Sequence, residues 1–267
     1  MNQLVLSLLS ATLFFEMVTG GLVAQDRGPT LRVLCYNIHH AEGVDKKLDL
    51  DRIASVIQSV KPDLVALQEV DQNVGRTDRV DQPRLLAEKT GLAVVFGKNI
   101  ALQGGHYGNA FLSRFPVKRS QNHLLPNFEQ GEQRGVIEAE VELPGSDTLL
   151  TVFATHFDHR PAEAERLASA KWIRKRVEAN EDRPALLAGD LNATPDSDTL
   201  ARMFEVWSSA NSEARPTVPV GKPLRQIDYI LFRPQNRWRV VEVRVLDESV
   251  ASDHRAIFAV LELIANE

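Results

Sequence analysis

The sequence has a single cysteine and no excess of positive charge. With one thiol, Cys35, an intramolecular disulfide is excluded, and its place in the apolar run from Leu31 to Tyr36 predicts a small buried side chain. The formal net charge of -5 excludes the broad positive field that drives non-specific binding to a nucleic-acid backbone. A local basic patch stays open, so nucleic acid is an open partner that the charge does not indicate.

Several familiar catalytic motifs are also missing. The chain has no cysteine and histidine cluster at zinc spacing, no glycine-rich phosphate loop of the GxxxxGKS kind and no GxSxG elbow. A cysteine or serine nucleophile is therefore not indicated. Beyond the N-terminal segment, no apolar run reaches the roughly 20 residues needed to cross a bilayer.

Residues 1–24 contain the apolar run LVLSLLSATLFF and then GGLVA before Gln25, which predicts an export segment followed by a small-residue cleavage site. The segment lacks Lys and Arg, and Glu16 interrupts it, so a retained N-terminal anchor is the alternative. We expect an exported protein, periplasmic or secreted, with membrane contact open through an uncleaved N-terminus.

The rest of the chain, residues 28–265, predicts one α/β domain, because no Pro/Gly/Ser-rich linker and no internal repeat divides it. We expect it to be a monomer. A helix over Leu50–Val60 is capped by Asp49, a second is opened by Pro161, and a short one follows Ser197. Two packed sheets would accommodate the apolar runs that read as strands. Those runs are Leu31–Ile38, Leu64–Gln68, Ala93–Gly97, Asn109–Ser113, Gly135–Leu143, Leu149–His156, Ala185–Ala188, Asp228–Phe232, Arg239–Leu246 and His254–Leu263.

Four of the predicted strands end in a polar residue that a core strand has no reason to carry. These residues are Asn37, Glu69, His156 and Asp190. Functional groups at strand ends can meet at one rim of a sheet. Each residue alone also has a structural explanation, such as a turn cap or a satisfied core imidazole.

Asp228 and the triplet Ser252-Asp253-His254 precede their apolar runs instead. They join the same rim only if those two strands run antiparallel to the others. Together these residues supply carboxylates, carboxamides and imidazoles, the inventory for holding a hard cation and moving protons at neutral pH. His39 and His40 adjoin Asn37, and because adjacent strand side chains point oppositely, at most one is expected to reach the site.

These blocks, in this order, resemble the endonuclease/exonuclease/phosphatase superfamily, which includes pancreatic deoxyribonuclease, abasic-site endonucleases, neutral sphingomyelinases and inositol-polyphosphate phosphatases. The resemblance covers Leu31 to Leu263 and implies a four-layer αββα sandwich of two mixed β-sheets flanked by helices. The blocks YGNAFLSRFPV, QRG and THFDHRP are similar to a bacterial branch, taken here as exported, that also resembles proteins of glycosylphosphatidylinositol remodelling. The blocks that carry the superfamily resemblance are CYNIHH with Asn37, LQEV with Glu69, THFDH with His156, GDLNATP with Asp190 and Asn192, IDYIL with Asp228, and SDH with Asp253 and His254.

The resemblance implies that Glu69, with Asn37 and Asp253, binds Mg²⁺ or Mn²⁺, which polarises a phosphoryl oxygen. It implies that Asp228 orients His254 and that this pair activates water for in-line attack.

For the other residues, the resemblance implies that Asp190 and Asn192 position water and phosphate, while His156 assists the phosphate or the leaving group. Asn109, His159 and Arg160 are expected to contact the substrate. Where the deoxyribonuclease pattern has a Glu to pair with its first histidine, this chain has Tyr107-Gly108-Asn109. His156 is therefore expected to face Asn109 or solvent.

The predicted activity is metal-dependent hydrolysis of a phosphodiester or phosphomonoester. Two alternatives within this class are a nuclease acting on DNA or RNA and a phosphodiesterase acting on a lipid or glycosylphosphatidylinositol-related substrate. A non-catalytic binding module of the same fold is a further interpretation, although this chain has a matching residue at every principal catalytic and metal-binding position of the superfamily.

Overall fold

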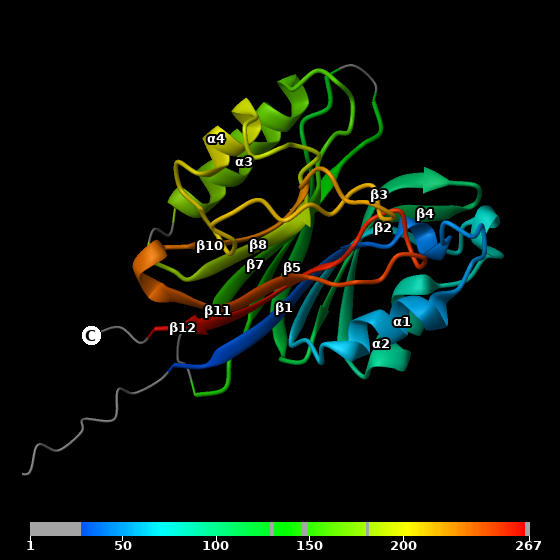
Figure 1. Cartoon of the computed structure of the whole chain (residues 1–267), viewed down its shortest axis with the longest axis horizontal. Helices are drawn as coiled ribbons and strands as arrows, with labels where there is room; N and C mark the ends of the chain where they lie inside the picture. Colours follow the sequence, from blue (N-terminus) through cyan, green and yellow to red (C-terminus); the bar gives the residue numbers. More distant parts are fainter. Residues whose placement is uncertain (1–27, 129–130, 146–148, 180–181, 265–267) are drawn as a thin grey trace, which may run out of the picture.

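A computed structural model describes residues 28–128, 131–145, 149–179 and 182–264, and it contains two six-stranded mixed sheets (Figure 1). The first sheet has the order β11 (Trp238–Val245), β12 (Ile257–Leu263), β1 (Thr30–Asn37), β2 (Leu64–Gln72), β4 (Gly105–Ser113) and β3 (Ala93–Leu102). The second has the order β5 (Val117–Leu124), β6 (Gly135–Val141), β7 (Leu150–His156), β8 (Ala185–Asp190), β10 (Asp228–Arg233) and β9 (Ser208–Ser209).

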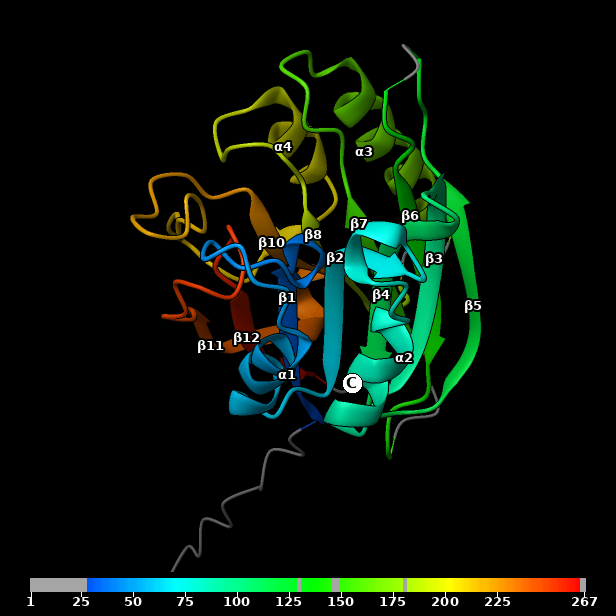
Figure 2. The same cartoon turned by 90° about the vertical axis from the view of Figure 1, so that its right-hand side faces the viewer.

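Helices cover the outer face of each sheet, so the layers follow the order helix, sheet, sheet, helix (Figures 1 and 2). The helices α1 (Leu50–Ser59) and α2 (Gln82–Thr90) pack on the first sheet, and α3 (Ala164–Glu178) and α4 (Asp198–Met203) pack on the second. Short 3-10 turns are η1 (His39–Ala41), η2 (Gly75–Thr77) and η3 (Gln235–Arg237). The predicted four-layer α/β sandwich is confirmed.

Strand β1 shows why the sheets pack in this way. Alternate residues point to opposite faces of a strand. Val33 and the free thiol of Cys35 lie in the core between the sheets, while Leu34 and Tyr36 pack toward α1 and α2. The prediction of a small buried cysteine is confirmed, and the apolar run within β1 is explained because both faces of the strand are covered.

The strand directions meet the condition on which the shared rim depends. Strand β1 is parallel to β2, and β7 is parallel to β8, so their carboxyl ends share an edge. Strand β12 is antiparallel to β1, and β10 is antiparallel to β8. The starts of β10 and β12 therefore lie beside the ends of the other four strands.

Several local predictions were wrong. Strand β5 was missed because its sequence, VKRSQNHL, is polar, as suits an exposed sheet edge. Helix α2 was missed although Asp81 caps it, Pro83 lies in its first turn and Gly91 ends it at a φ of 71°.

Two further predictions, on the limits of a helix and of a strand, fail. Helix α3 begins three residues after Pro161, and its Glu165 and Arg166 are buried, with Arg166 donating to the carbonyls of Asp158 and Arg160. His254 lies in the loop before β12 and not within that strand.

Candidate active site

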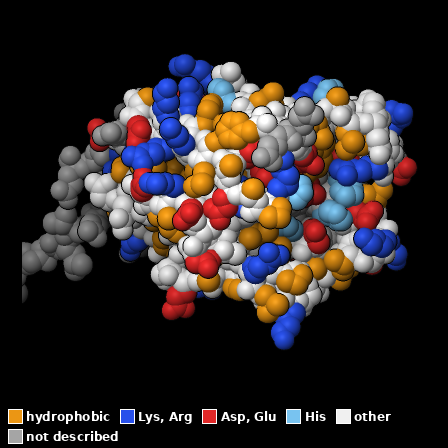
Figure 3. Space-filling view, turned by 90° about the horizontal axis from the view of Figure 1, so that it is seen from above, with side chains coloured by type: hydrophobic (Ala, Val, Ile, Leu, Met, Phe, Trp, Pro, Cys, Tyr) orange, Lys and Arg blue, Asp and Glu red, His pale blue; other side chains and the backbone are white. Residues whose placement is uncertain are grey.

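The sequence-predicted polar residues meet at the rim where the strand ends converge. Seen from above, histidine side chains gather there next to acidic ones, with Lys and Arg side chains nearby (Figure 3). One connected set of polar contacts joins most of the predicted catalytic and metal-binding residues. Its members are Asn37, Glu69, His156, Asp190, Asn192, Asp228 and His254.

Glu69 is aimed into the rim by an irregularity in β2. The pairing of β2 with β4 shifts register between Leu67 and Val70, and Glu69 has a φ of 58°. A bulge of this kind changes the direction of a side chain next to an active site. A left-handed backbone at a non-glycine residue costs on the order of 1 kcal/mol, so the surrounding structure must impose it.

Asn37, at the end of β1, links the two sheets through its carboxamide. Its Nδ2 donates to Glu69 Oε1 at 3.0 Å and to Asp190 Oδ2 at 3.2 Å. Its Oδ1 accepts the backbone N–H of His39 at 3.1 Å. The amide is fully buried, so it fixes the distance between the two carboxylates.

Asp190 lies at the centre of the site. Its Oδ2 is 3.4 Å from His156 Nε2 and 3.7 Å from His254 Nε2, and its Oδ1 accepts the backbone N–H of Asn192. Burial, followed by the nearby Asp228 carboxylate, raises the pKa of Asp190 to about 7. A carboxylate in this state is a competent proton acceptor near neutral pH.

His254 is held by a carboxylate on its far side. Its Nδ1 donates to Asp228 Oδ2 at 2.9 Å, and the Thr217 hydroxyl donates to the same oxygen at 2.5 Å. Burial acts to lower the pKa of His254, but the charge and hydrogen bond of Asp228 raise it to about 10. Ser252 accepts from the His254 backbone N–H and donates to the Asn37 carbonyl, which fixes this loop on β1.

His156 has a different partner from the one expected. Asn109 donates to the Gly135 carbonyl instead, and Arg134 Nη1 lies 3.0 Å from His156 Nδ1. A guanidinium can only donate, so Nδ1 accepts, and the proton of the neutral ring is on Nε2, which lies 3.0 Å from the Asn192 side-chain amide and 3.4 Å from Asp190 Oδ2. Burial, followed by the charge of Arg134, holds the pKa of His156 well below its usual range.

The remaining residues predicted for the site differ in how closely they are connected to it. His159 approaches the site through Arg134, whose Nη2 lies 3.0 Å from His159 Nδ1. Arg160 instead forms ion pairs with Asp158 and Glu165. Asp253 is exposed and, among the residues that the structure describes, belongs to neither cluster of close metal-ligand atoms, whereas Glu69 belongs to one.

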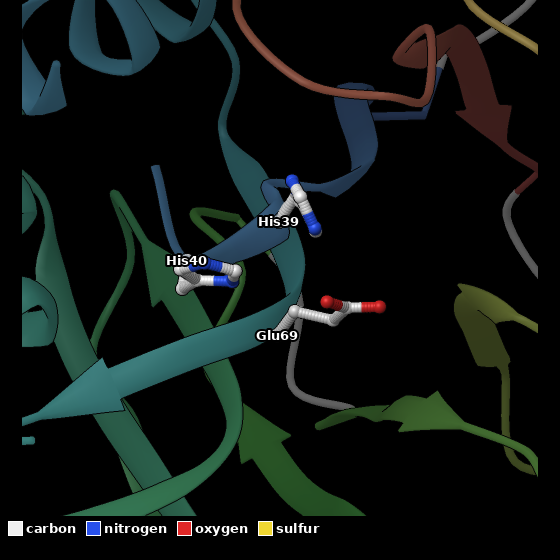
Figure 4. Close-up of side chains that lie close together, drawn as sticks. All are labelled: His39, His40 and Glu69. Atoms are coloured by element: carbon white, nitrogen blue, oxygen red, sulfur yellow. The ribbon is translucent and has the colours of Figure 1, made fainter. Parts of the chain in front are cut away.

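The prediction that at most one of His39 and His40 reaches the site was wrong. Strand β1 ends at Asn37, and the following residues turn with φ of 45° and 43°. The alternation of a strand therefore does not apply. Ligand atoms of both imidazoles and of Glu69 lie within 4.8 Å of one another (Figure 4).

Sequence reasoning did not assign a role to Arg134 or Thr217. Arg134 stands in the QRG block, whose polar and charged residues directly precede the apolar start of β6. That position is comparable to the one that drew attention to Asp228. Thr217 carried no such signal, because it lies in an irregular loop and reaches Asp228 only through tertiary packing.

The donor chemistry at the rim suits a divalent cation. Glu69 provides carboxylate oxygens at a partly exposed position, and no thiolate is near because Cys35 lies in the core. Oxygen donors of this kind suit Mg²⁺ and Mn²⁺. Asn37 in its present orientation serves Glu69 as a hydrogen-bond donor, with its oxygen engaged by His39.

The sequence profile of the Endonuclease/Exonuclease/phosphatase family matches residues 34–254. The chain belongs to this family, whose members are metal-dependent phosphoesterases or nucleases that hydrolyse phosphoester bonds. The first and last matched residues, Leu34 and His254, enclose all the site residues joined in the network above.

The chain is similar in sequence to the Escherichia coli protein YbhP, with 25% identity across 88% of this chain and 97% of that protein. Its fold is similar to that of an endonuclease/exonuclease/phosphatase protein from Beutenbergia cavernae, with a TM-score of 0.77, 28% identity, and 88% and 72% of the two chains covered. It is also similar to the Bacteroides thetaiotaomicron mannosyl-6-phosphatase, with a TM-score of 0.72 and 17% identity over 86% and 99% of the two chains. The last likeness concerns the fold alone.

Residues 1–24, predicted as a signal peptide or anchor, lie outside the described residues. Within the described part of the chain, no helix has the length and apolar character to cross a membrane.

Proposed function

We propose that this protein is a divalent-metal-dependent phosphoesterase that hydrolyses its substrate by direct attack of water. The observation that carries the proposal is the position of Asp190. Its buried carboxylate lies between two imidazoles and is joined to Glu69 through Asn37. A proton acceptor, a proton donor and a metal-binding carboxylate thus surround one space, which is the constellation that hydrolysis of a phosphate ester needs.

Glu69 would hold the cation, which supplies charge neutralisation at a phosphoryl oxygen when bound. Asn37 positions Glu69 relative to Asp190. With its raised pKa, Asp190 accepts the proton of the attacking water, and Asn192, which donates its backbone N–H to Oδ1, keeps that carboxylate in place.

The two histidines then have separate tasks. His254 is held protonated by Asp228 and stabilises negative charge on the phosphate, which differs from the expectation that it accepts the proton. His156 is neutral, and its Nε2 proton is available to the phosphate or to the leaving oxygen.

The substrate class within this proposal is a phosphodiester or phosphomonoester of a sugar or lipid. The net charge of -5 favours such a substrate over non-specific binding to duplex nucleic acid. The mannosyl-6-phosphatase with the same fold is a sugar-phosphate enzyme by its name. A nuclease and a glycosylphosphatidylinositol-related phosphodiesterase are the alternative activities, and a screen of DNA, RNA, phosphoinositides, sphingomyelin and sugar phosphates distinguishes them.

The test of the proposal is turnover of bis(p-nitrophenyl) phosphate and p-nitrophenyl phosphate with Mg²⁺ or Mn²⁺, before and after chelation. Chelator should abolish turnover. Glu69→Gln should remove it while leaving the far-UV circular dichroism unchanged. Glu88→Gln is the matched control, because Glu88 is exposed and pairs only with Arg84 on α2. Full activity in excess chelator, or an active Glu69→Gln variant, would refute the proposal.

The proposed location is outside the cytoplasm, in the periplasm or the medium, because of the apolar N-terminal segment and the single cysteine. Mass spectrometry of the natural protein should find cleavage near Ala24. An intact N-terminus in the membrane fraction would support the anchor reading, and an intact N-terminus in the cytosol would contradict export.

A further inference from the structure

His39, His40 and Glu69 surround a small space beside the proposed catalytic rim. The two histidines come from η1 and Glu69 comes from β2, and the two rings are 4.5 Å apart between centroids at 60° (Figure 4). One ligand atom from each of the three residues lies within 4.8 Å of the other two. Ligand atoms about 2.1 Å from one cation are at most about 4.2 Å apart, so the three groups would have to move slightly closer to bind it.

The hydrogen bond of His39 leaves one ring nitrogen available as a ligand. Its Nδ1 lies 3.0 Å from the Glu42 carbonyl, which can only accept. Nδ1 therefore bears the proton, and Nε2 has its lone pair free. A metal-binding histidine commonly donates its second ring N–H to a carbonyl or carboxylate in this way.

His40 contributes a buried polar atom without a partner. The residue is 9% exposed, and its Nδ1 has no hydrogen-bond partner among the residues that the structure describes. A buried polar atom of this kind costs free energy unless it is satisfied.

The backbone of all three residues is forced into the left-handed region. The φ angles are 45°, 43° and 58° for His39, His40 and Glu69. Specific contacts hold this geometry, since Gln82 Nε2 donates to the His40 carbonyl and Asn37 Oδ1 accepts the His39 N–H. Strained backbone of this kind concentrates at ligand sites, where the geometry serves the ligand.

We propose that His39, His40 and Glu69 form a mixed nitrogen and oxygen site for a first-row transition-metal dication such as Mn²⁺, Co²⁺ or Zn²⁺. This inference rests on the proposed function in one respect, because Glu69 is also the residue that would hold the catalytic ion. Imidazole nitrogen favours these metals, whereas Mg²⁺ favours a shell made of oxygen alone. The site thus selects a transition metal at Glu69 over Mg²⁺.

Two variants remove the imidazoles with little effect on the backbone. His39→Asn and His40→Asn replace each ring by the residue that best tolerates a left-handed conformation. The matched control is His123→Asn. It removes the imidazole of His123, which lies on the exposed strand β5 and pairs with Glu138 on β6. Circular dichroism verifies that each variant is folded.

The first measurement uses Mn²⁺ alone with the full-length protein and detects nitrogen coupling by pulsed electron paramagnetic resonance. The wild type and His123→Asn should show coupling from imidazole nitrogen, and each site variant should show less. Visible absorption of bound Co²⁺ should give an affinity lowered at least about tenfold in His39→Asn and His40→Asn, the scale seen when support of a metal site is removed. The Mg²⁺ affinity should barely change.

If Mn²⁺ bound to the wild-type protein shows no coupling to nitrogen, the inference is wrong, whatever the variants show. Coupling and Co²⁺ affinity that persist in both site variants would overturn it as well. These results are independent of turnover. If the wild type binds Mn²⁺ through nitrogen but hydrolyses no phosphate ester with any metal, the proposed function fails and the metal site stands.

Discussion

The two imidazoles of the site face the same central carboxylate, yet their surroundings oppose each other. His254 lies in the loop before β12 of the first sheet and donates to Asp228, while His156 ends β7 of the second sheet and accepts from Arg134. The exposed fractions are 7% and 3%, so burial is similar. The pKa of His254 is raised to about 10, and that of His156 is lowered well below its usual range.

The comparison teaches that the charge behind a ring, rather than its depth, decides its protonation state. Desolvation disfavours the charged form of both histidines. At His254 a carboxylate outweighs this effect, and at His156 a guanidinium adds to it. One site therefore holds a charged imidazole and a neutral one at the same pH, which assigns them different tasks in hydrolysis.

The largest expected effect comes from removing the carboxylate behind His254. Asp228→Asn should lower the pKa of His254 and reduce turnover on the order of a hundredfold or more, the usual scale for general acid-base groups. The pKa is followed by the histidine C2 proton in NMR titrations. Asp247→Asn is the matched control, because its carboxylate is exposed and pairs with Arg255, away from the site. Turnover close to that of the wild type would contradict the proposed pairing.

The next effect tests the guanidinium behind His156. Arg134→Met should raise the pKa of His156, free its tautomer and reduce turnover on the order of tenfold, as for other residues that orient a functional imidazole. Nitrogen NMR shifts of His156 report the tautomer directly. Arg119→Met serves as control, since Arg119 is exposed and pairs with Glu140.

Two substrates sharpen the role of His156. If His156 donates its Nε2 proton to the leaving group, His156→Ala and Arg134→Met should both harm a poor leaving group more than an activated one. Equal losses on both substrates would limit His156 to binding phosphate.

A third effect appears in the stability of the fold. The pKa of His254 is raised from an ordinary value of 6.5 to about 10, so its pairing with Asp228 stabilises the fold fully below pH 6.5. This contribution is lost as pH rises through about 10. The difference in Tm between the wild type and Asp228→Asn should therefore be greatest at pH 6.5 and below, and it should shrink as the pH rises toward 10. A difference that grows with pH would reverse the sign and refute the pairing.

The smallest effect is expected at Asn109. Its side chain donates to the Gly135 carbonyl, which is outside the catalytic network. Asn109→Ala should lower the free energy of unfolding by about 1 kcal/mol, with a loss of turnover far below that of Asp228→Asn. Chemical denaturation and steady-state kinetics measure the two quantities. A loss of turnover equal to that of Asp228→Asn would restore Asn109 to the site.

Much of the fold was predictable because buried strands leave a clear apolar pattern. The runs at β1, β2, β7 and β8 were found, and two packed sheets were expected, although no run was assigned to either sheet. The edge strand β5 was not, since an exposed edge does not need apolar residues. The apolar pattern failed at β5 because this strand is exposed to solvent.

The sequence predicted which residues form the site better than it predicted which of them contact one another. The roles of Glu69 and Asp190 stay predictions, but the structure brings both to one rim. The pairing of His254 with Asp228 was anticipated. The pairing of His156 with Arg134 was not anticipated, because Arg134 directly precedes β6, His156 ends the neighbouring β7, and their contact depends on side-chain reach.

The sequence by itself determined the family, the layers and the strand ends that carry the polar groups, because these depend on apolar periodicity and short ordered motifs. Only the tertiary structure decided which charge stands behind each imidazole and that His39 and His40 both face Glu69. The physical reason is the distance along the chain over which each property is determined. Burial pattern is a local property of the chain, whereas an electrostatic environment is a sum over neighbours that folding brings together from distant positions.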